Sequence, residues 1–230
     1  MQRIVIKLLT IIGILIVSFQ SVAGQETDKL GSWYVYNGFI NFSPKVELFV
    51  ESQLRTWEPI TNIQNLFFRP YLSYNFTPDF QVGLGQEYHV NWTYAENKND
   101  KIKSEEYRIT LQAMLFQKVD RVSIQHRFRY EFRLLDEAGN QRTRYRIQLG
   151  IPITDKNMGK GVLFATVGNE IMVDTQKELA LSQIRLYAML GYQFSKTTHF
   201  QFGYMYISRP SADGLHRLQF FLTQRFATYN

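Results

Sequence analysis

The 230-residue chain has no cysteine, only 6 prolines and no long apolar run beyond its N-terminal region. The lack of cysteine excludes disulfides, thiolate metal sites, a cysteine nucleophile and a lipid anchor on an N-terminal cysteine. A membrane-spanning helix needs about 20 apolar residues, and no later segment supplies them. Charged residues make up 20% of the chain and are spread along it, which argues against long disordered tracts. A formal net charge of +6 does not by itself indicate nucleic-acid binding, and we expect no nucleic-acid partner.

The N-terminal segment has the three parts of a secretory signal peptide. Arg3 and Lys7 form a basic start, residues 8–19 form an apolar core, and residues 21–24 supply small side chains for cleavage. The apolar core is too short to be a membrane anchor. We therefore expect residues 1–24 to be a signal peptide, cleaved after Ala23 or Gly24, and residues 25–230 to be a single domain.

The exported part is rich in aromatic residues and has a hydrophobic period of two. In residues 80–94, Leu84, Tyr88 and Trp92 belong to an apolar phase, whereas Glu87 and His89 belong to a polar one. Successive side chains of a strand point to opposite faces, so this alternation predicts strands with one apolar face. The same pattern is found in eleven segments: 32–42, 46–57, 63–76, 80–94, 105–117, 121–135, 142–153, 161–173, 182–194, 199–208 and 216–226.

These segments have the length and the connections of a membrane barrel. Most exceed the usual strand of about 5 or 6 residues and reach the roughly 9–11 residues that a tilted strand needs to cross a bilayer. Tight turns alternate with longer polar links, apart from an extra long link at residues 154–160. Short periplasmic turns and longer outer loops are typical of outer-membrane barrels. The expected fold is all-β, an antiparallel up-and-down transmembrane β-barrel in the cell outer membrane; an exported soluble β-protein is the alternative.

The expected number of strands is even, although the sequence shows eleven alternating segments. Bacterial single-chain barrels have an even number of strands, so eleven segments predict about 12 strands, with 10 as the alternative; residues 25–31 are the candidate for an additional short strand. Leu218, Leu222 and Phe226 share one phase near the C-terminus, although Gln224 interrupts it. This pattern resembles the signal that the barrel assembly machinery reads, so we expect that machinery and outer-membrane lipid as partners.

The polar phase carries nearly all the charges, and arginine exceeds glutamate there. Arginine on a lipid-facing position costs about 2–4 kcal/mol at the membrane midplane, so these side chains are expected to line the lumen. They can fill it as Arg–Glu pairs or form an anion-selective path or a site for an acidic ligand. The expected lining residues are Glu51, Arg55, Glu87, Arg108, Arg127, Arg129, Glu131, Arg133, Arg142, Arg144, Arg146, Glu170, Arg185 and Arg217.

Several short motifs are spread along the chain after the signal peptide. They are the Arg-x-Arg strands at 127–133 and 142–146, Gly168-Asn169-Glu170, Gln183 to Tyr187, Gly191-Tyr192, Trp33, the Glu51/Arg55 pair and His216-Arg217-Leu218. Together they resemble an uncharacterised bacterial family, domain of unknown function 2490, over nearly all of the chain after the signal peptide. The resemblance implies an outer-membrane β-barrel and no known activity, cofactor or catalytic residue.

The histidines provide little support for catalysis. A lipid-modifying enzyme needs a nucleophile and a base within hydrogen-bond reach. His126 is expected on the lipid face, whereas Ser123 is in the opposite phase, and His89 and His216 are expected in the lumen without a serine partner. No metal-ligand spacing is present. We therefore expect a structural or passive barrel that is not an enzyme and has no cofactor. The alternative is a small anion-selective channel or a transporter for a small anionic solute. A lipid-modifying enzyme is the least favoured possibility. The sequence leaves the oligomeric state open.

Overall fold

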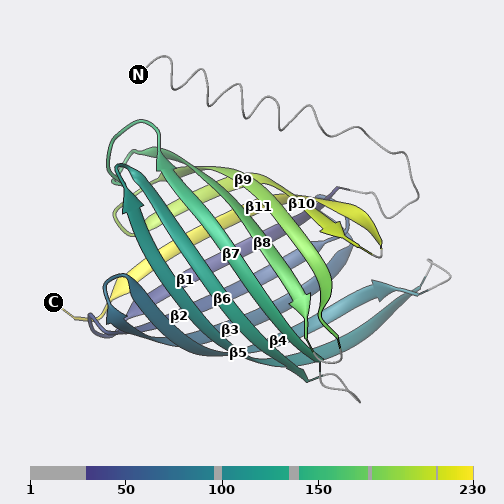
Figure 1. Ribbon diagram of the computed structural model, residues 1–230. Coiled ribbons are helices and arrows are strands. Elements are labelled where there is room, and N and C mark those ends of the chain that lie inside the picture. Colours follow the sequence, from purple (N-terminus) through teal and green to yellow (C-terminus); the bar gives the residue numbers. More distant parts are fainter. Residues whose placement is uncertain (1–29, 96–99, 135–139, 176–177, 211, 230) are drawn as a thin grey trace.

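A computed structural model describes residues 30–95, 100–134, 140–175, 178–210 and 212–229, which form a closed β-barrel (Figure 1). Within these residues no helix is long and apolar enough to span a membrane. The described chain contains eleven strands: β1 Gly31–Asn41, β2 Val46–Thr56, β3 Ile63–Thr77, β4 Phe80–Tyr94, β5 Lys101–Val119, β6 Val122–Leu134, β7 Asn140–Pro152, β8 Leu163–Asp174, β9 Ala180–Gln193, β10 Thr198–Arg209 and β11 Ala212–Ala227.

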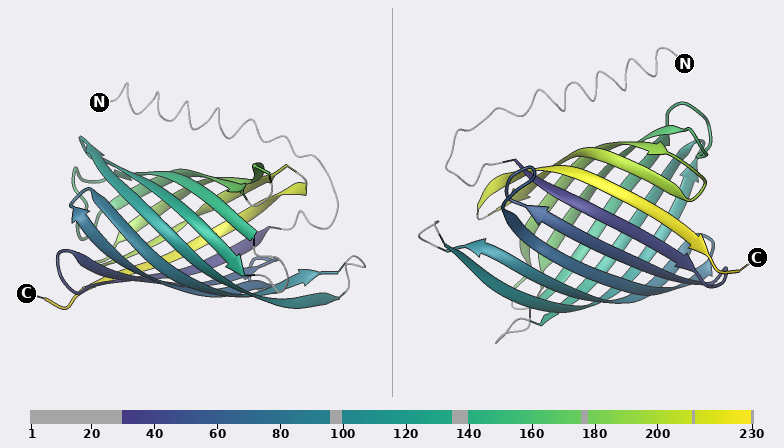
Figure 2. Two further views of the ribbon diagram at one scale, coloured as in Figure 1. Left: turned by 60° about the horizontal axis from the view of Figure 1, so that its bottom comes forward. Right: turned by 180° about the vertical axis from the view of Figure 1, so that it is seen from behind.

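The strands follow chain order around the barrel, and one pair closes it. Neighbours in sequence are antiparallel. The closing pair is parallel and runs from Gly31 opposite Arg217 to Asn41 opposite Ala227. In a meander with an odd number of strands, the first and last strands run in the same direction, so they can pair only in parallel. The right-hand view of Figure 2 shows purple β1 beside yellow β11.

The all-β barrel fold is confirmed, and the eleven alternating segments coincide with the eleven strands. The expected number of about 12 strands, or 10, brackets the observed one. The proposed signal peptide at residues 1–24 and most of the proposed extra strand at residues 25–31 lie outside the described residues; Gly31 is the first residue of β1.

Two strands are longer than the sequence pattern indicated. β5 begins at Lys101, four residues earlier than expected, and Lys101 lies opposite Tyr94. β11 likewise begins at Ala212 rather than at His216. Both extensions were expected to be loops because their residues are polar. Backbone pairing in a hairpin continues regardless of side-chain polarity, and the β4–β5 hairpin projects past the rim (Figures 1 and 2).

The two ends of the barrel differ in their connections. We call the end with the links at 42–45, 78–79, 120–121, 153–162 and 194–197 the turn end, and the opposite end the loop end. Asp120, in the link between β5 and β6, has a φ of 52°. Aspartate tolerates this left-handed conformation because its short side chain can bond locally, which suits it to a two-residue link.

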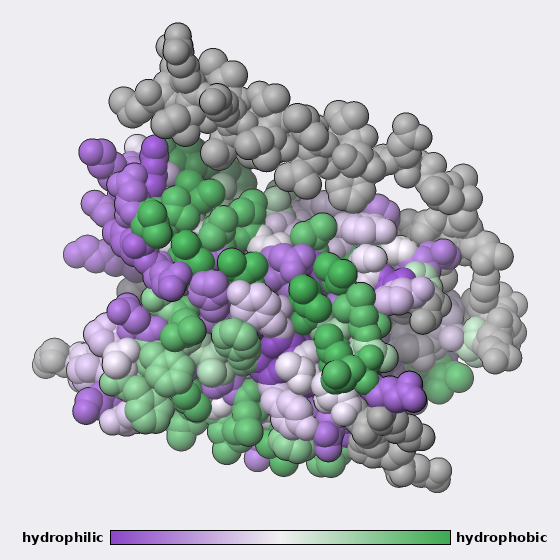
Figure 3. Space-filling view, in the orientation of Figure 1, coloured by the Kyte–Doolittle hydropathy of each residue, from purple (hydrophilic) through white to green (hydrophobic). Residues whose placement is uncertain are grey.

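The barrel has polar side chains inside and apolar side chains outside. Gln81 and Glu87 are buried on β4, whereas Leu84 on the same strand is 54% exposed. Leu72, opposite Leu84 on β3, is 57% exposed. Figure 3 shows groups of hydrophobic side chains spread over the outer wall. This is the reverse of a soluble protein, whose core is apolar.

The interior has one apolar wall as well as charged ones. Trp33 and Val35 of β1 pack with Met205 and Ile207 of β10 and with Leu215 of β11. The strands across the barrel, β5 to β8, carry most of the ion-paired arginines and glutamates. The apolar wall next to the closing pair still meets charged groups, because Arg55 and Arg185 lie over Trp33 and Arg217 is buried on β11.

Gly85 makes room for a buried aromatic ring. Gly85 on β4 lies opposite Tyr71 on β3, and a Cβ at position 85 would collide with the Tyr71 ring. Tyr71 is fully buried, and its hydroxyl donates a hydrogen bond of 2.5 Å to Glu87. The missing side chain at position 85 thus lets Tyr71 lie along the wall and reach the charged residues.

Candidate functional site

The expected lining residues all lie in the barrel interior, in two groups along its length. One group lies toward the loop end and outside the interior cavity described below: Glu87, Arg108, Glu131, Arg133, Arg142 and Arg217. The other group lines that cavity: Glu51, Arg55, Arg127, Arg129, Arg144, Arg146, Glu170 and Arg185.

Glu106 binds two arginines at the loop end. Arg108 donates to both of its carboxylate oxygens at 2.8 Å. Arg133 donates to the same two oxygens at 2.5 and 3.1 Å. Two-point arginine–carboxylate contacts fix geometry as well as charge. Because Glu106 is only 3% exposed, both guanidinium groups are held against the interior wall.

A chain of ion pairs continues from Arg108 toward the middle of the barrel. Glu131 lies 3.5 Å from Arg108 and 2.5 Å from Arg144. Arg144 also reaches Glu170 at 2.8 Å. Glu170 is shared further with Arg127 at 2.6 Å and Arg185 at 3.1 Å. Five neighbouring strands, β5 to β9, are thus cross-linked inside the barrel, and we call this chain of pairs, together with Glu106 and Arg133, the ion-pair network.

Glu87 extends the charged region to β3 and β4. Its carboxylate accepts hydrogen bonds from Tyr71 and Thr110, at 2.5 and 3.2 Å, and lies 2.9 Å from Nε2 of His89. Arg69 and Arg108 lie 3.7 and 3.9 Å away. A buried carboxylate is stable only when hydrogen bonds and opposite charges replace its hydration. Glu87 has both, so it is a packed part of the interior.

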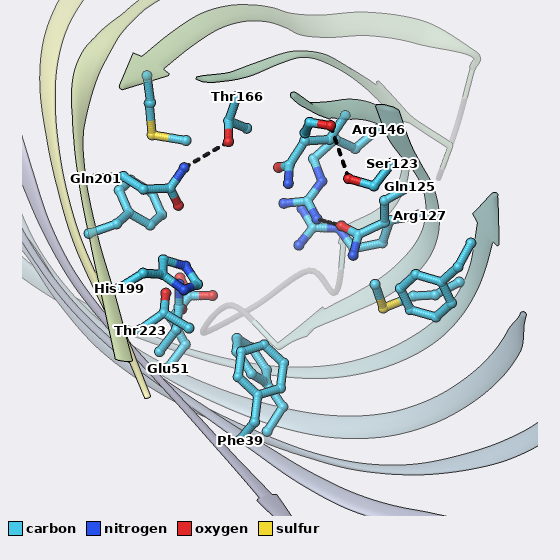
Figure 4. A pocket seen from close by; sticks show the side chains of 18 of the residues that line it. Phe39, Glu51, Ser123, Gln125, Arg127, Arg146, Thr166, His199, Gln201 and Thr223 are labelled. Atoms are coloured by element: carbon cyan, nitrogen blue, oxygen red, sulfur yellow. Dashed lines mark hydrogen bonds between the residues drawn. The ribbon is translucent and has the colours of Figure 1, made fainter. Parts of the chain in front are cut away.

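The turn half of the interior contains a cavity of about 770 Å³. Figure 4 shows Arg127, Arg146 and Gln125 on one side of it and Gln201, Thr166 and His199 on the other. The cavity is lined by eleven lysine and arginine side chains and by three glutamates. It extends to the exposed residues 156–158 of the link between β7 and β8, so it opens toward the turn end. The cavity is therefore strongly cationic.

Three cavity arginines that lie on strands have no carboxylate partner among the described residues; Arg121, in the link between β5 and β6, also has none. Within the described part of the chain, Arg55, Arg129 and Arg146 form no ion pair. Arg55 instead lies 3.8 Å over the ring of Trp33. Arg129 donates to Gln112 at 2.7 Å, and Arg146 donates to Gln125. Neutral amides satisfy hydrogen bonds but leave the positive charges uncompensated.

The histidines are placed separately from these groups. His126 lies on the outer wall, where its Nδ1 is 2.8 Å from the hydroxyl of Tyr145. The expectation that His216 lies in the lumen is wrong. Its neighbour Arg217 is the buried residue, and His216 contacts the rings of Tyr204 and Tyr206 on the outside. Adjacent residues of a strand face opposite walls, so His216 and Arg217 could not both lie in the lumen as expected. His89 is buried inside as expected.

The sequence interpretation missed several residues of the site. Glu106 shares the phase of Arg108, two positions away, and this spacing was the signal that could have identified it. Gln53, Gln112 and Gln125 were also missed, although they lie in the polar phase between the arginines. In the described chain no group of three or more histidine, aspartate or glutamate side chains is arranged to hold a metal ion.

Comparison with known proteins identifies the family. Residues 30–219 match the family described as "Protein of unknown function (DUF2490)". The chain belongs to this family. The match includes every strand from β1 to β10 and all residues of the ion-pair network. No curated protein and no solved structure matches the chain.

Proposed function

We propose that this member of the family is an outer-membrane β-barrel whose outer wall contacts lipid. The support comes from the apolar exterior. On β3, Leu66, Phe68, Leu72, Tyr74 and Phe76 share one face, and each is 41% to 60% exposed. Monomeric soluble proteins rarely expose contiguous apolar patches of more than a few hundred Å². A lipid environment removes the cost of exposing such a wall to water.

Aromatic side chains near both ends agree with this location. Trp57 and Tyr94 contact each other at the loop end, with their ring centroids 5.8 Å apart. Tyr74 and Phe76 form a similar pair at the turn end, at 5.0 Å. Aromatic girdles occupy the two interfaces of membrane barrels. The spacing of these pairs along the strands fits a band of lipid between them.

Within that location we infer a structural or passive barrel rather than a conducting one. The observation that carries this proposal is the ion-pair network. It places buried ion-paired groups, including Glu106 and Glu131, across the loop half of the interior. Such pairs hold each other in place, because withdrawing one partner leaves an uncompensated buried charge. The cavity would then be open at the turn end and closed toward the loop end.

Conductance and membrane fractionation test the proposal together. Cell fractionation is expected to recover the protein with outer-membrane marker proteins. The refolded protein, inserted in a planar bilayer, is expected to give no steady current, although heat-modifiable gel migration shows a folded barrel. A steady current from folded protein would contradict the closed interior. Recovery in the soluble periplasmic fraction would contradict the membrane location.

A small anion-selective channel or transporter is the second candidate. It is favoured by the excess of cationic over anionic side chains around the cavity, because arginine-lined pores select anions. A salt gradient across the bilayer distinguishes it from the first candidate. Steady current with anion selectivity would replace the passive barrel by a channel, whereas cation selectivity would contradict both.

We propose two partners, outer-membrane lipid and the barrel assembly machinery, and no catalytic activity. Leu222 and Phe226 lie on the outer face of β11 and are 39% and 48% exposed. They are therefore accessible for recognition during assembly. The absence of catalysis is supported by the tyrosine partners of His126 and His216, since an acyl-transfer site requires a nucleophile beside its base.

A further inference from the structure

We propose that the cavity at the turn end is a binding site for a small oxyanion, a molecule with carboxylate or phosphate groups and hydroxyls, and that Arg55, Arg129 and Arg146 hold its charged part. The site goes beyond a passive barrel. It does not depend on the membrane location, because binding can be measured on the folded barrel in detergent.

The side chains around the cavity carry a large excess of positive charge. Three glutamates face eleven lysine and arginine side chains there. Glu170 is already shared by Arg127, Arg144 and Arg185. Glu131 also pairs with Arg144 but is itself shared with Arg108, so the two carboxylates do not neutralise these guanidinium groups, and additional negative charge in the cavity would be stabilised. In an interior shielded from water such attraction is stronger than at a surface.

Arg129 is the clearest unsatisfied cation. It is 3% exposed, and its Nη1 has no hydrogen-bond partner in the described chain. Its other contacts are a hydrogen bond from Nε to Gln112 and the ring of Tyr71, 4.8 Å from the guanidinium carbon. A buried charge without a counterion is costly. An anion in the adjacent cavity, which Arg129 lines, would supply a counterion for this charge.

Arg146 and Arg55 extend the site along the wall. Arg146 lies directly opposite Arg127 on the neighbouring strand, an arrangement in which like charges repel. Its Nε, like Nη1 of Arg129, has no hydrogen-bond partner in the described residues. Arg55 is held over Trp33 by ring stacking. The stacking of Arg55 on Trp33 and the hydrogen bond from Arg146 to Gln125 orient the two guanidinium groups before a ligand arrives, which reduces the entropy cost of binding.

The opposite wall indicates the remainder of the ligand. Gln201 and Thr166 are hydrogen-bonded to each other at 2.7 Å, and Thr223 and His199 lie near them (Figure 4). These neutral side chains offer donors and acceptors to hydroxyl groups. A ligand with an anionic end toward Arg129 and Arg146 and a hydroxyl-bearing end toward Gln201 matches both walls. Its entrance is the turn end, beside the exposed residues 156–158.

Calorimetry on the folded full-length barrel in detergent tests the site. Citrate and pyrophosphate are the probes, because they present carboxylate and phosphate oxyanions respectively, and uncharged sucrose is the control ligand. Saturable binding of at least one oxyanion, weakened by added salt, is expected. Comparing the two probes identifies the preferred oxyanion. If neither oxyanion binds, or if sucrose binds equally well, the proposal is wrong.

Matched variants locate the binding. Arg129→Gln and Arg146→Gln each keep a polar side chain but remove a charge, and each is expected to weaken binding about tenfold or more, as for a hydrogen bond to a charged group. Arg209→Gln is the control, because Arg209 lies at the loop end and does not line the cavity. Equal affinity in all three variants would place the anion elsewhere and overturn the proposal.

Chemical modification keeps the test decisive if the variants fail to fold. The unmodified sequence is treated with phenylglyoxal, which reacts with arginine, with and without the bound probe, and modified residues are mapped by mass spectrometry. The probe is expected to protect Arg55, Arg129 and Arg146 and to leave Arg209 unprotected. Uniform reactivity in both samples would overturn the site. A conducting barrel with intact protection would contradict the closed interior alone.

Discussion

Arg129 on β6 and Arg144 on β7 lie directly opposite each other inside the barrel, yet only Arg144 is ion-paired. Glu131 and Glu170 both bind Arg144, from its two sides. Arg129 has a neutral amide and an aromatic ring instead. Arg144 therefore cross-links neighbouring strands, whereas the positive charge of Arg129 is not compensated by a carboxylate.

Removing the shared carboxylate should destabilise the barrel strongly. Glu170→Ala would leave Arg127, Arg144 and Arg185 without this counterion. Breaking a buried ion pair typically costs about 3–5 kcal/mol, and we expect a loss of that size in the free energy of unfolding. Urea titration of the protein in lipid vesicles measures it, and Glu131→Ala is expected to behave similarly.

The control for this prediction is a surface pair. Glu105 contacts Lys103 at 2.9 Å, and both side chains are well exposed. Glu105→Ala should change stability by no more than about 1 kcal/mol. Unchanged stability of both Glu170→Ala and Glu131→Ala would show that the network is dispensable for folding.

The outer wall should respond to charge according to depth. Phe128 is in the middle of β6 and Leu134 is its last residue, and both face outward, 46% and 56% exposed. If lipid surrounds the wall, Phe128→Arg should cost about 2–4 kcal/mol and Leu134→Arg about 0–1 kcal/mol. Folding titrations into vesicles measure both values. Equal costs at the two depths would be inconsistent with a membrane-spanning wall.

Gly85 should be intolerant of even a methyl group. Gly85→Ala places a Cβ against the buried Tyr71 ring, which must then move away from Glu87. Overpacking of this kind costs about 1–3 kcal/mol, so a lower urea midpoint is expected. Gly159→Ala is the matched control, because a Cβ there meets nothing within 4 Å. Equal midpoints for the two variants would mean that Tyr71 repositions freely.

The histidine substitutions address catalysis. His126→Ala removes a contact with Tyr145, and His216→Ala removes contacts with Tyr204 and Tyr206. Because both partners are tyrosines on the outer wall, neither change is expected to alter membrane lipids. Mass spectrometry of lipids from cells that carry each variant tests this. Loss of a lipid modification in either strain would support a lipid-modifying enzyme.

The period-two pattern predicts which wall a side chain faces but not its partner. Glu170 and Arg185 lie opposite each other, 15 residues apart in sequence, on consecutive strands of a hairpin. The alternation places both inside. Whether they meet depends on the register of β8 against β9, which the alternation does not determine. Similarly, nothing in the pattern distinguishes paired Arg144 from unpaired Arg129.

The alternation also does not predict where each strand begins and ends. Polar residues predicted a loop at 95–104, yet Lys101 and Lys103 belong to β5, because backbone pairing carried the hairpin past the barrel rim. His216 was expected in the lumen together with Arg217, although adjacent residues of a strand face opposite walls; on the same strand, apolar Leu215 is buried in the interior phase. Where the interior itself is partly apolar, as in the cluster around Trp33, alternation no longer separates the two faces.

The odd strand number fixes the topology of the two chain termini. β1 begins at the loop end, at Gly31, and β11 ends at the turn end, at Ala227. A tag joined before β1 and a tag joined after β11 should therefore lie on opposite sides of any bilayer around the barrel. An even-stranded barrel has both on one side. Protease shaving of intact cells that carry both tags should therefore remove exactly one of them, and its identity reports the orientation of the whole barrel.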